Sequence, residues 1–386
     1  MLSLCLIVPA LQVLVIGGGP NPQYNQVAIE SNVRYMGKIV KPDSPFRVLF
    51  ADGNLASKSV QYLSDKAVGE QNIGPFSAGG TRHLYREPQL PRLDGAAELN
   101  NVRSEIVALA SQKEAPAFIY FTGHGSVASD LKVSQFDLWS RQRFAVPDLV
   151  NALSTYPKGK RVTLLMVQCH SSDFANVMYR NGDPIQGLSD LRVCGFFASI
   201  SARPAAGCTP AVNEEFYKDF SSYFLAALTG KDRVGRPVVG ADYDHNGKVG
   251  MNEAFCWSLV NDDSIDTPVC TSDVFLKKAA QMSDVDVFHT SYNEVIKWAS
   301  PSQRAALIGL SDKLGLEGDE RLSGAFDKYG KIGPDEERPM PILGYRFVSL
   351  VRSVVLGHMM KSNPDRAMRN RYDELTKDEA SNPFQS

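Results

Sequence analysis

The amino-acid sequence predicts an α/β fold in which a mostly parallel sheet of about six strands lies between helices. Two observations support this prediction. Short, nearly continuous apolar runs alternate with longer segments of helical periodicity, and strands joined by crossover helices are apolar along their whole length because both of their faces are buried. The chain also has 386 residues, which is enough for one large core with an appendage.

Five apolar runs are the expected strands, and they span residues 12–17, 46–51, 117–122, 162–168 and 193–200. Helices are expected between and after them, at 25–40, 96–112, 147–156 and 214–229. In the last of these segments, Phe216, Phe220 and Phe224 recur at helical spacing. Residues 52–92 are polar and rich in Gly, Ser and Pro, which indicates a long surface excursion.

Composition and periodicity divide the chain into four segments, at 1–11, 12–232, 233–282 and 283–386. The first is an apolar stretch that resembles the end of a secretory signal, or alternatively an extended first strand. The signal interpretation favours a periplasmic or secreted location over the cytoplasm. The second segment holds the expected sheet, the third an acidic loop with a following helix, and the fourth a charged helical extension. Its last residues, 365–386, are strongly polar and are expected to fray.

The composition also bears on the classes of partner. The apolar and charged fractions, 43% and 22%, are ordinary for a soluble globular protein. The formal charge is −2 and no run of Lys or Arg exists, so no nucleic-acid partner is expected. After residue 20 no apolar run approaches the length of a membrane-spanning helix, so no transmembrane segment is expected. The six cysteines show neither zinc-site spacing nor the pattern of a disulfide scaffold.

Two of the expected strands end in a reactive residue. The motif T-G-H-G-S places His124 after 117–122, and Q-C-H-S-S places Cys169 at the end of 162–168. In open α/β sheets, ligands bind beyond the carboxyl ends of the strands. If these strands are neighbours, the His124 imidazole can reach the Cys169 thiol, raise its thiolate population and carry its proton. Taken alone, either residue is better explained as structural, but their joint occurrence favours a catalytic pair.

The glycines on either side of His124 allow a substrate to approach the backbone closely. The N–H groups of Gly125 and Cys169 are therefore the expected donors to the oxyanion of a tetrahedral intermediate. Such an intermediate forms when a thiolate attacks a peptide carbonyl and collapses to a thioester.

The two motifs, each after an apolar strand, resemble the active-site motifs of clan CD cysteine peptidases, the group that includes caspases, metacaspases and legumains. Four further stretches resemble bacterial members of the legumain-like (C13) branch: V-L-V-I-G-G-G-P at 13–20, Y-N-Q-V-A-I-E-S-N-V at 24–33, L-F-A-D-G at 49–53 and A-G-C-T-P at 206–210. The resemblance covers about residues 12–275. It implies a caspase-haemoglobinase fold with 12–232 as catalytic domain, a His124–Cys169 dyad and a protein or peptide substrate.

Three positions depart from the pattern of these relatives. Val167 stands where metacaspases and legumains carry an acidic residue of the specificity pocket, and Ser172 replaces a glycine that often follows the C-x-S run. Tyr24-Asn25 stands where legumains carry an Arg-His pair. These departures argue against specificity for asparagine or for basic side chains.

The exit of the strand 193–200 occupies the position that forms a pocket wall in relatives. Ser199 and Ser201 are therefore the candidate substrate-binding residues, with simple strand packing as the alternative. Arg203 follows them, and we expect it to be an exposed surface residue rather than a ligand for acidic side chains.

The segment from Asp242 to Glu253 fits the twelve-residue EF-hand calcium loop. Its expected ligands are the side chains at positions 1, 3, 5 and 12 and the carbonyl at position 7: Asp242, Asp244, Asn246, Glu253 and Lys248. The alternative is an Asn/Gly turn that caps the next helix. Residues 234–240 do not resemble an entering helix and no second loop exists, which favours a structural Ca²⁺ over a sensor. His170 and His245 are expected to face solvent, and no organic cofactor is expected.

Two functions from different classes remain at this point. The first is a cysteine endopeptidase with a structural calcium site, whose acyl-enzyme would be resolved by water, or by an amine in a transamidase or ligase. The second is a catalytically slow or inactive caspase-like module that binds calcium and a protein partner. A thiol redox protein is the weaker third alternative, because no second cysteine lies near Cys169 in the sequence.

Overall fold

A six-stranded sheet forms the centre of the computed structural model, which describes residues 10–63, 83–111, 114–128, 133–279, 282–318 and 320–385. The strand order is β11-β10-β9-β5-β1-β2. The strands span Gln12–Gly18 (β1), Phe46–Phe50 (β2), Ala117–Gly123 (β5), Arg161–Met166 (β9), Arg192–Phe197 (β10) and Val269–Cys270 (β11). β11 is antiparallel to β10, and the other pairs are parallel. The predicted α/β class, with a mostly parallel sheet of about six strands, is confirmed, and it is consistent with a caspase-haemoglobinase fold.

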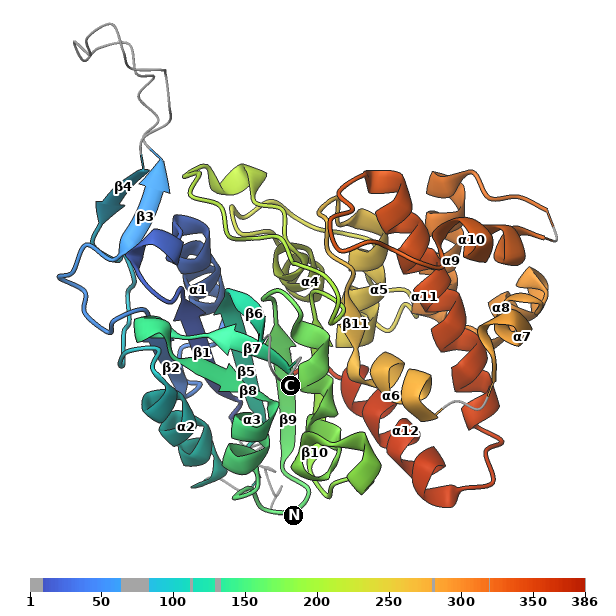
Figure 1. Cartoon of the computed structure of the whole chain (residues 1–386), viewed down its shortest axis with the longest axis horizontal. Helices are drawn as coiled ribbons and strands as arrows, with labels where there is room; N and C mark the ends of the chain where they lie inside the picture. Colours follow the sequence, from blue (N-terminus) through green and yellow to red (C-terminus); the bar gives the residue numbers. More distant parts are fainter. Residues whose placement is uncertain are drawn as a thin grey trace, which may run out of the picture.

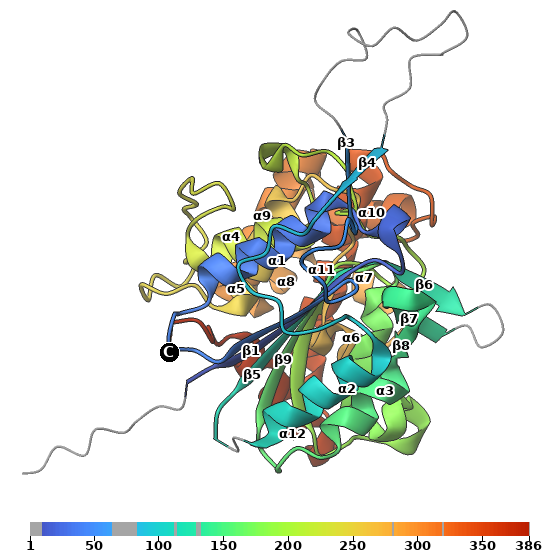
Figure 2. The ribbon, with the colours of Figure 1, turned by 90° about the vertical axis from the view of Figure 1, so that its left-hand side faces the viewer.

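Helices cover both faces of this sheet. Figure 2 shows α1 and α4 on one side of the strands and α2, α3 and α12 on the other. These helices span Val27–Ile39 (α1), Leu99–Ala108 (α2), Val146–Leu153 (α3), Phe220–Thr229 (α4) and Arg366–Glu379 (α12). Every residue of β1 and β5 is buried as a result, which is why their sequences are apolar without alternation.

Shorter elements extend from the ends of the strands. Two small sheets are formed by β3 (Val60–Leu63) with β4 (His83–Arg86), and by β6 (Gly125–Ala128), β7 (Val133–Asp137) and β8 (Arg143–Ala145). Single turns of 3-10 helix lie at Pro22–Tyr24, Leu109–Ser111, Trp139–Arg141, Arg180–Gly182, Pro184–Gln186 and Glu214–Phe216, and a longer one, η4, at Ser171–Met178. The expected excursion at 52–92 thus contains a hairpin, although 64–82 lie outside the described residues.

The second half of the chain is helical and lies on the right in Figure 1. Its helices span Met251–Asn261 (α5), Thr271–Ala279 (α6), Asp284–Phe288 (α7), Tyr292–Trp298 (α8), Pro301–Leu314 (α9), Arg321–Tyr329 (α10) and Pro339–Met360 (α11). Within the described ranges, α11 is the one helix long and apolar enough to cross a membrane, and 72% of its most apolar stretch is buried inside the protein. Its side chains belong to the same hydrophobic core as those of the sheet.

Two expectations about helices differ from the structure. The segment 214–229 is α-helical only from Phe220, because the Asp219 side chain accepts the N–H of Ser222 and caps a new helix there. The expected fraying of 365–386 is wrong, because α12 occupies most of this segment and contacts β10 and α6. Residues 1–9 of the candidate signal remnant lie outside the described residues.

The attachment of α12 to the sheet explains why this polar segment is ordered. The Arg192 guanidinium at the start of β10 donates two hydrogen bonds of 2.7 Å to the carboxylate of Asp378. The adjacent Glu379 is buried and accepts hydrogen bonds from the Ser272 N–H and hydroxyl at the start of α6. Buried, bidentate charged contacts of this kind stabilise far more than exposed ion pairs.

We therefore predict that Asp378→Ala lowers the free energy of unfolding by about 1.5 to 3 kcal/mol, because Arg192 loses a charged partner. Asp190→Ala is the matched control: Asp190 pairs with Lys158 at 4.0 Å and both side chains are more than four-fifths exposed, so a loss within about 0.5 kcal/mol is expected. Urea denaturation measures both values. Equal losses in the two variants would show that the α12 contact contributes no special stability.

Candidate functional site

The register between β5 and β9 brings the two expected catalytic residues to one edge of the sheet. The strands are parallel neighbours, with Phe121 opposite Met166. His124 and Cys169 each follow these paired residues by three positions, so both stand just beyond the carboxyl ends of their strands. The expectation that the two strands are neighbours is confirmed.

The Cys169 sulfur faces a backbone loop rather than open solvent. Its Sγ accepts a hydrogen bond from the Ala205 N–H at 3.2 Å, and the residue is partly exposed. Gly125 packs against the same residue, because a Cβ at this position would lie 2.3 Å from the Cys169 carbonyl oxygen. Only glycine fits here, because any side chain would overlap this carbonyl. The absence of a side chain lets the backbone of residue 125 lie close to the cysteine.

The electrostatic environment favours the neutral form of the thiol. Burial raises the pKa of Cys169, and the carboxylate of Asp266 raises it further. The Ala205 N–H, the cysteine's own N–H and the Gly125 N–H each lower this pKa, because they stabilise the thiolate. The two N–H groups expected to hold an oxyanion are thus among the groups that lower this pKa.

His124 is held by a residue that sequence reasoning missed. Its Nε2 lies 2.9 Å from Oε1 of Gln26, and the Tyr24 ring packs nearly perpendicular to the imidazole at 5.7 Å between centroids. Burial lowers the pKa of His124, opposed by Asp137 and by the backbone of Tyr24. Gln26 lies in the stretch 24–33 that resembles bacterial relatives, but nothing in its residue type signals a role beside a histidine.

Among the described residues, no hydrogen bond joins His124 to Cys169. The imidazole is hydrogen-bonded to the Gln26 side chain, and the Cys169 sulfur is hydrogen-bonded to the Ala205 backbone. Burial shifts the pKa of each residue in the direction that favours its uncharged form, the thiol for Cys169 and the neutral imidazole for His124. Catalytic hydrogen bonds are often long before a substrate binds.

A second cysteine lies at the same edge of the sheet. The Cys208 thiol donates to the carbonyl of Gly123, the residue before His124, at 3.6 Å. Burial raises the pKa of Cys208, and Cys169 is the largest charged contributor to that shift. The five cysteines in the described part of the chain are free thiols. The two residues are distant in sequence, which is why the sequence did not reveal this pair.

The two expected substrate-binding residues, Ser199 and Ser201, follow β10 and differ in their exposure to solvent. Ser199 is fully buried and donates to the Arg203 carbonyl at 2.8 Å, so its hydroxyl stabilises a turn. Ser201 is exposed and lines a cavity of about 350 Å³ together with Ser172 and Ile200. Ser201 is therefore the more accessible of the two candidate substrate-binding residues.

The expectation for Arg203 is wrong, because the side chain is fully buried instead of exposed. Its guanidinium donates to backbone carbonyls of the loop between α10 and α11, with 2.6 Å to that of Glu336 and a further contact to that of Gly333. Burying this cation is tolerated because carbonyl oxygens replace the water that it loses. His170 is partly exposed, and its Nδ1 bonds the Ser201 carbonyl.

The expected calcium loop gathers three of its five expected ligands. Asp242, Asp244 and Glu253 each offer a carboxylate oxygen, and these oxygens lie within 4.8 Å of one another. Asn246 and Lys248 line the same cavity of about 330 Å³ as Asp244 and Glu253. As expected, residues 234–240 form no helix, and α5 begins at Met251. His245 is exposed.

Backbone hydrogen bonds give this loop its shape. The Asp242 carboxylate accepts the N–H groups of Asn246 and Gly247 at 3.1 and 3.0 Å. The buried Glu253 accepts the N–H groups of Tyr243 and Gly250, both at 2.8 Å. A carboxylate has about four acceptor sites, so these bonds leave oxygen lone pairs for a cation. The donor set is all oxygen, which suits Ca²⁺.

Comparisons with known proteins give little guidance. No protein family and no curated protein matches the sequence. Protein GSU0716 from Geobacter sulfurreducens is similar in structure, with 12% identity, a TM-score of 0.37 and coverage of 68% of this chain and 92% of that chain. A secreted C11 cysteine protease from Bacteroides thetaiotaomicron, solved in complex with an irreversible peptide inhibitor, shows 14% identity, a TM-score of 0.31 and coverage of 95% and 82%. The fold therefore rests on the topology above, and the C13 branch stays a prediction.

We predict that Gly125→Ala displaces Cys169 and lowers the free energy of unfolding by about 1 to 3 kcal/mol, because the new Cβ overlaps the cysteine carbonyl. Gly324→Ala is the control: this exposed helical glycine has nothing within 4 Å of an added Cβ, and alanine should stabilise the helix by about 0.5 to 1 kcal/mol. Chemical denaturation measures both. Unchanged stability in the Gly125 variant would contradict the close packing.

Proposed function

We propose that the chain is a cysteine endopeptidase in which Cys169 is the nucleophile and His124 the general base and acid. One observation carries the proposal: a cysteine and a histidine follow adjacent parallel strands at the same register, at the edge where open α/β sheets bind ligands. Residues 12–232 supply both groups. The substrate would be a protein or peptide.

The proposed reaction begins from the neutral pair. His124 takes the thiol proton as Cys169 Sγ attacks the peptide carbonyl carbon, and the N–H groups of Gly125 and Cys169 stabilise the oxyanion. The intermediate collapses to a thioester when His124 gives its proton to the leaving amine. Water, activated by the same imidazole, then releases the acid and regenerates the thiol; an amine in place of water would give ligation.

Two further residues have roles in this proposal. Gln26 is a positioning residue, because its amide oxygen bonds His124 Nε2 and fixes which way the ring faces. Ser201 is the proposed substrate contact, since it is exposed on a cavity that Ser172 also lines, and its carbonyl bonds His170, the residue after the nucleophile. Ser199 does not contact the substrate in this proposal, and its buried hydroxyl stabilises the turn that follows β10. Val167 is buried and apolar, so it offers no charge to a substrate side chain.

Labelling by an irreversible peptide-based cysteine trap tests the peptidase proposal. The wild type should be labelled at Cys169, Cys169→Ala should not be labelled, and His124→Ala should react about 10²- to 10⁴-fold more slowly because the proton acceptor is lost. Cys208→Ala is the matched control, because it removes the neighbouring thiol and should leave labelling intact. Mass spectrometry identifies the labelled residue. A folded wild type that is never labelled at Cys169 would disprove the assignment.

A second candidate function is favoured by one observation, the separate hydrogen bonding of His124 and Cys169. A protein with this scaffold and an unreactive thiol would act as a calcium-binding interaction module. Thiol reactivity distinguishes the two, because an active dyad reacts rapidly near neutral pH and a buried structural cysteine does not. Absence of trap labelling, together with retained calcium binding, would support the second function.

We further propose that the loop 242–253 binds one structural Ca²⁺. Three carboxylates within 4.8 Å of one another repel each other unless a cation lies between them. The side chains of Asp242, Asp244, Asn246 and Glu253 and the Lys248 carbonyl are the proposed ligands. The ion would join the start of α5 to the preceding segment. It takes no part in the proposed peptide-bond chemistry.

The calcium proposal predicts that 10 mM Ca²⁺ raises the free energy of unfolding of the wild type by about 1.4 to 2.7 kcal/mol, for a dissociation constant of about 10⁻⁴ to 10⁻³ M. Asp244→Ala should lose this increment. Asp232→Ala, in the neighbouring turn but outside the loop, should keep it. Urea denaturation with calcium or with a chelator measures the effect, and equal stabilisation of wild type and Asp244→Ala would rule out this site.

A further inference from the structure

The loop 203–206 is the part of the molecule that holds the nucleophile in place. The Ala205 N–H donates to Cys169 Sγ at 3.2 Å, and the His170 N–H donates to the Arg203 carbonyl at 3.0 Å. The thiol and the residue after it therefore both depend on the position of this loop. An N–H aimed at sulfur stabilises the thiolate and so sets the thiol's reactivity.

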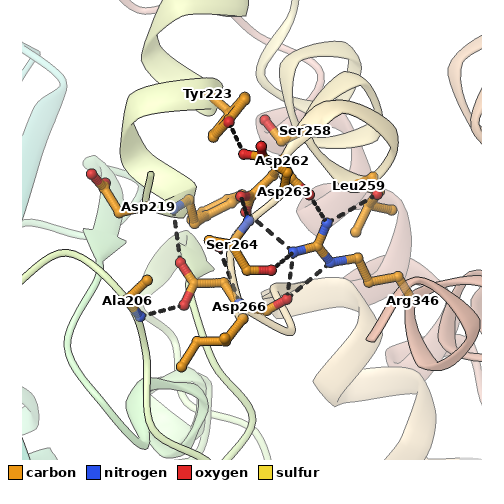
Figure 3. A network of polar contacts seen from close by, with 12 residues as sticks. Ala206, Asp219, Tyr223, Ser258, Leu259, Asp262, Asp263, Ser264, Asp266 and Arg346 are labelled. Atoms are coloured by element: carbon orange, nitrogen blue, oxygen red, sulfur yellow. Dashed lines mark hydrogen bonds and ion pairs between the residues drawn. The ribbon is translucent and has the colours of Figure 1, made fainter. Parts of the chain in front are cut away.

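Besides Ser199 and the Arg203 side chain, a buried carboxylate holds this loop against the rest of the protein. Asp266 is fully buried, and one of its oxygens accepts the Ala206 N–H at 2.6 Å. Its other oxygen accepts the N–H of Phe220, the first residue of α4, at 2.8 Å. Figure 3 shows the Asp266 carboxylate pointing toward Ala206. Asp266 thus ties the loop to a helix that packs on the sheet.

Asp266 is itself held by an arginine of the C-terminal helices. Arg346 lies on α11 and is 1% exposed. Its guanidinium donates to the Asp266 carbonyl at 2.9 and 2.7 Å and to the Ser264 carbonyl at 3.2 Å, and it forms an ion pair of 3.3 Å with Asp262 (Figure 3). This cation fixes the backbone on both sides of residue 265.

We propose that Asp266 is a positioning residue for Cys169, and that Arg346 keeps Asp266 in place. The inference rests on the proposed nucleophilic role of Cys169. The contacts form one continuous path from α11 through Arg346, Asp266 and the Ala205–Ala206 backbone to the sulfur. Asp266 contacts neither a substrate nor the sulfur directly, and it acts through the loop that it anchors.

The anchor and the charge of Asp266 act on the thiol in opposite directions. The Ala205 N–H, which Asp266 holds in place through Ala206, lowers the pKa of Cys169, whereas the negative charge of Asp266 raises it. Burial raises the pKa of Asp266 itself, as do the carboxylates of Asp262 and Asp219, and Arg346 and the two N–H groups face it. Because the pKa of Asp266 is raised to about 8, removing only its charge should change the thiol little near pH 7, whereas removing the anchor should slow its reaction.

The test is the pH dependence of Cys169 alkylation by iodoacetamide in the full chain, followed by mass spectrometry. Asp266→Ala removes the anchor, so we expect alkylation near pH 7 to be about tenfold slower and its midpoint to move to higher pH, as for loss of one hydrogen bond to a charged group. Asp266→Asn keeps one acceptor and removes the charge, so its rate should equal or exceed that of the wild type. Asp273→Asn, at a partly buried aspartate that accepts the Cys270 N–H at the start of α6, is the matched control and should match the wild type.

A wild-type alkylation profile in folded Asp266→Ala would overturn the inference, and so would equal slowing in the Ala and Asn variants, which indicates a general loss of structure. If Asp266→Ala does not fold, Arg346→Lys tests the inference instead, because lysine keeps the positive charge but lacks the guanidinium fork. Slower alkylation of this variant supports the inference, and a wild-type profile overturns it. Peptide-trap labelling separates the two proposals. Failure of the wild type to react with the trap removes the peptidase function, whereas a reactive wild type with an unshifted Asp266→Ala profile removes only the positioning role.

Discussion

The parallel pairing of β9, β5 and β1 is the constraint on which the candidate site depends. These three adjacent strands end at one edge of the sheet, and their exits supply Cys169, His124 and Gln26 in that order. No long loop is needed to bring the three groups together. Because all seven residues of both β1 and β5 are buried, a change of register would alter the packing on two faces at once. The relative positions of these three residues are therefore fixed by the packing of the core.

The charges buried near this edge show how the first and second halves of the chain are joined. Arg203 comes from the exit of β10 and reaches carbonyls between α10 and α11, while Arg346 comes from α11 and reaches the segment after α5. Arg203 thus joins the first half to the second, whereas Arg346 holds a segment between α5 and α6 whose Asp266 side chain reaches the loop 203–206. Buried charges of this kind contribute less to net stability than apolar packing of equal area, because each charged group loses its water. Their fixed geometry instead determines how the two halves lie against each other.

Local features of the sequence were sufficient for most of the sheet and for the edge where the site lies. Five strands and the pairing of the two that carry His124 and Cys169 were predictable, because continuous apolar runs have few alternative structures. The burial of Arg203 was not, because its partners at Gly333 and Glu336 are distant in sequence. The role of Gln26 beside His124 was missed for the same reason. The sequence also did not predict that α12 is an ordered helix, because its buried residues include acids whose partners lie on β10 and α6.

The path from α11 to the thiol also has a consequence for protein synthesis. A ribosome makes Cys169 long before Arg346, and at 5 to 20 residues per second the interval is roughly ten to thirty seconds. During that time the strand that carries the cysteine exists without the arginine that fixes Asp266. The thiol of a nascent chain therefore lacks its ordered N–H donor. Under the proposed function, Cys169 would become reactive only after α11 has been made and folded, and the emerging chain would until then be protected from premature cleavage.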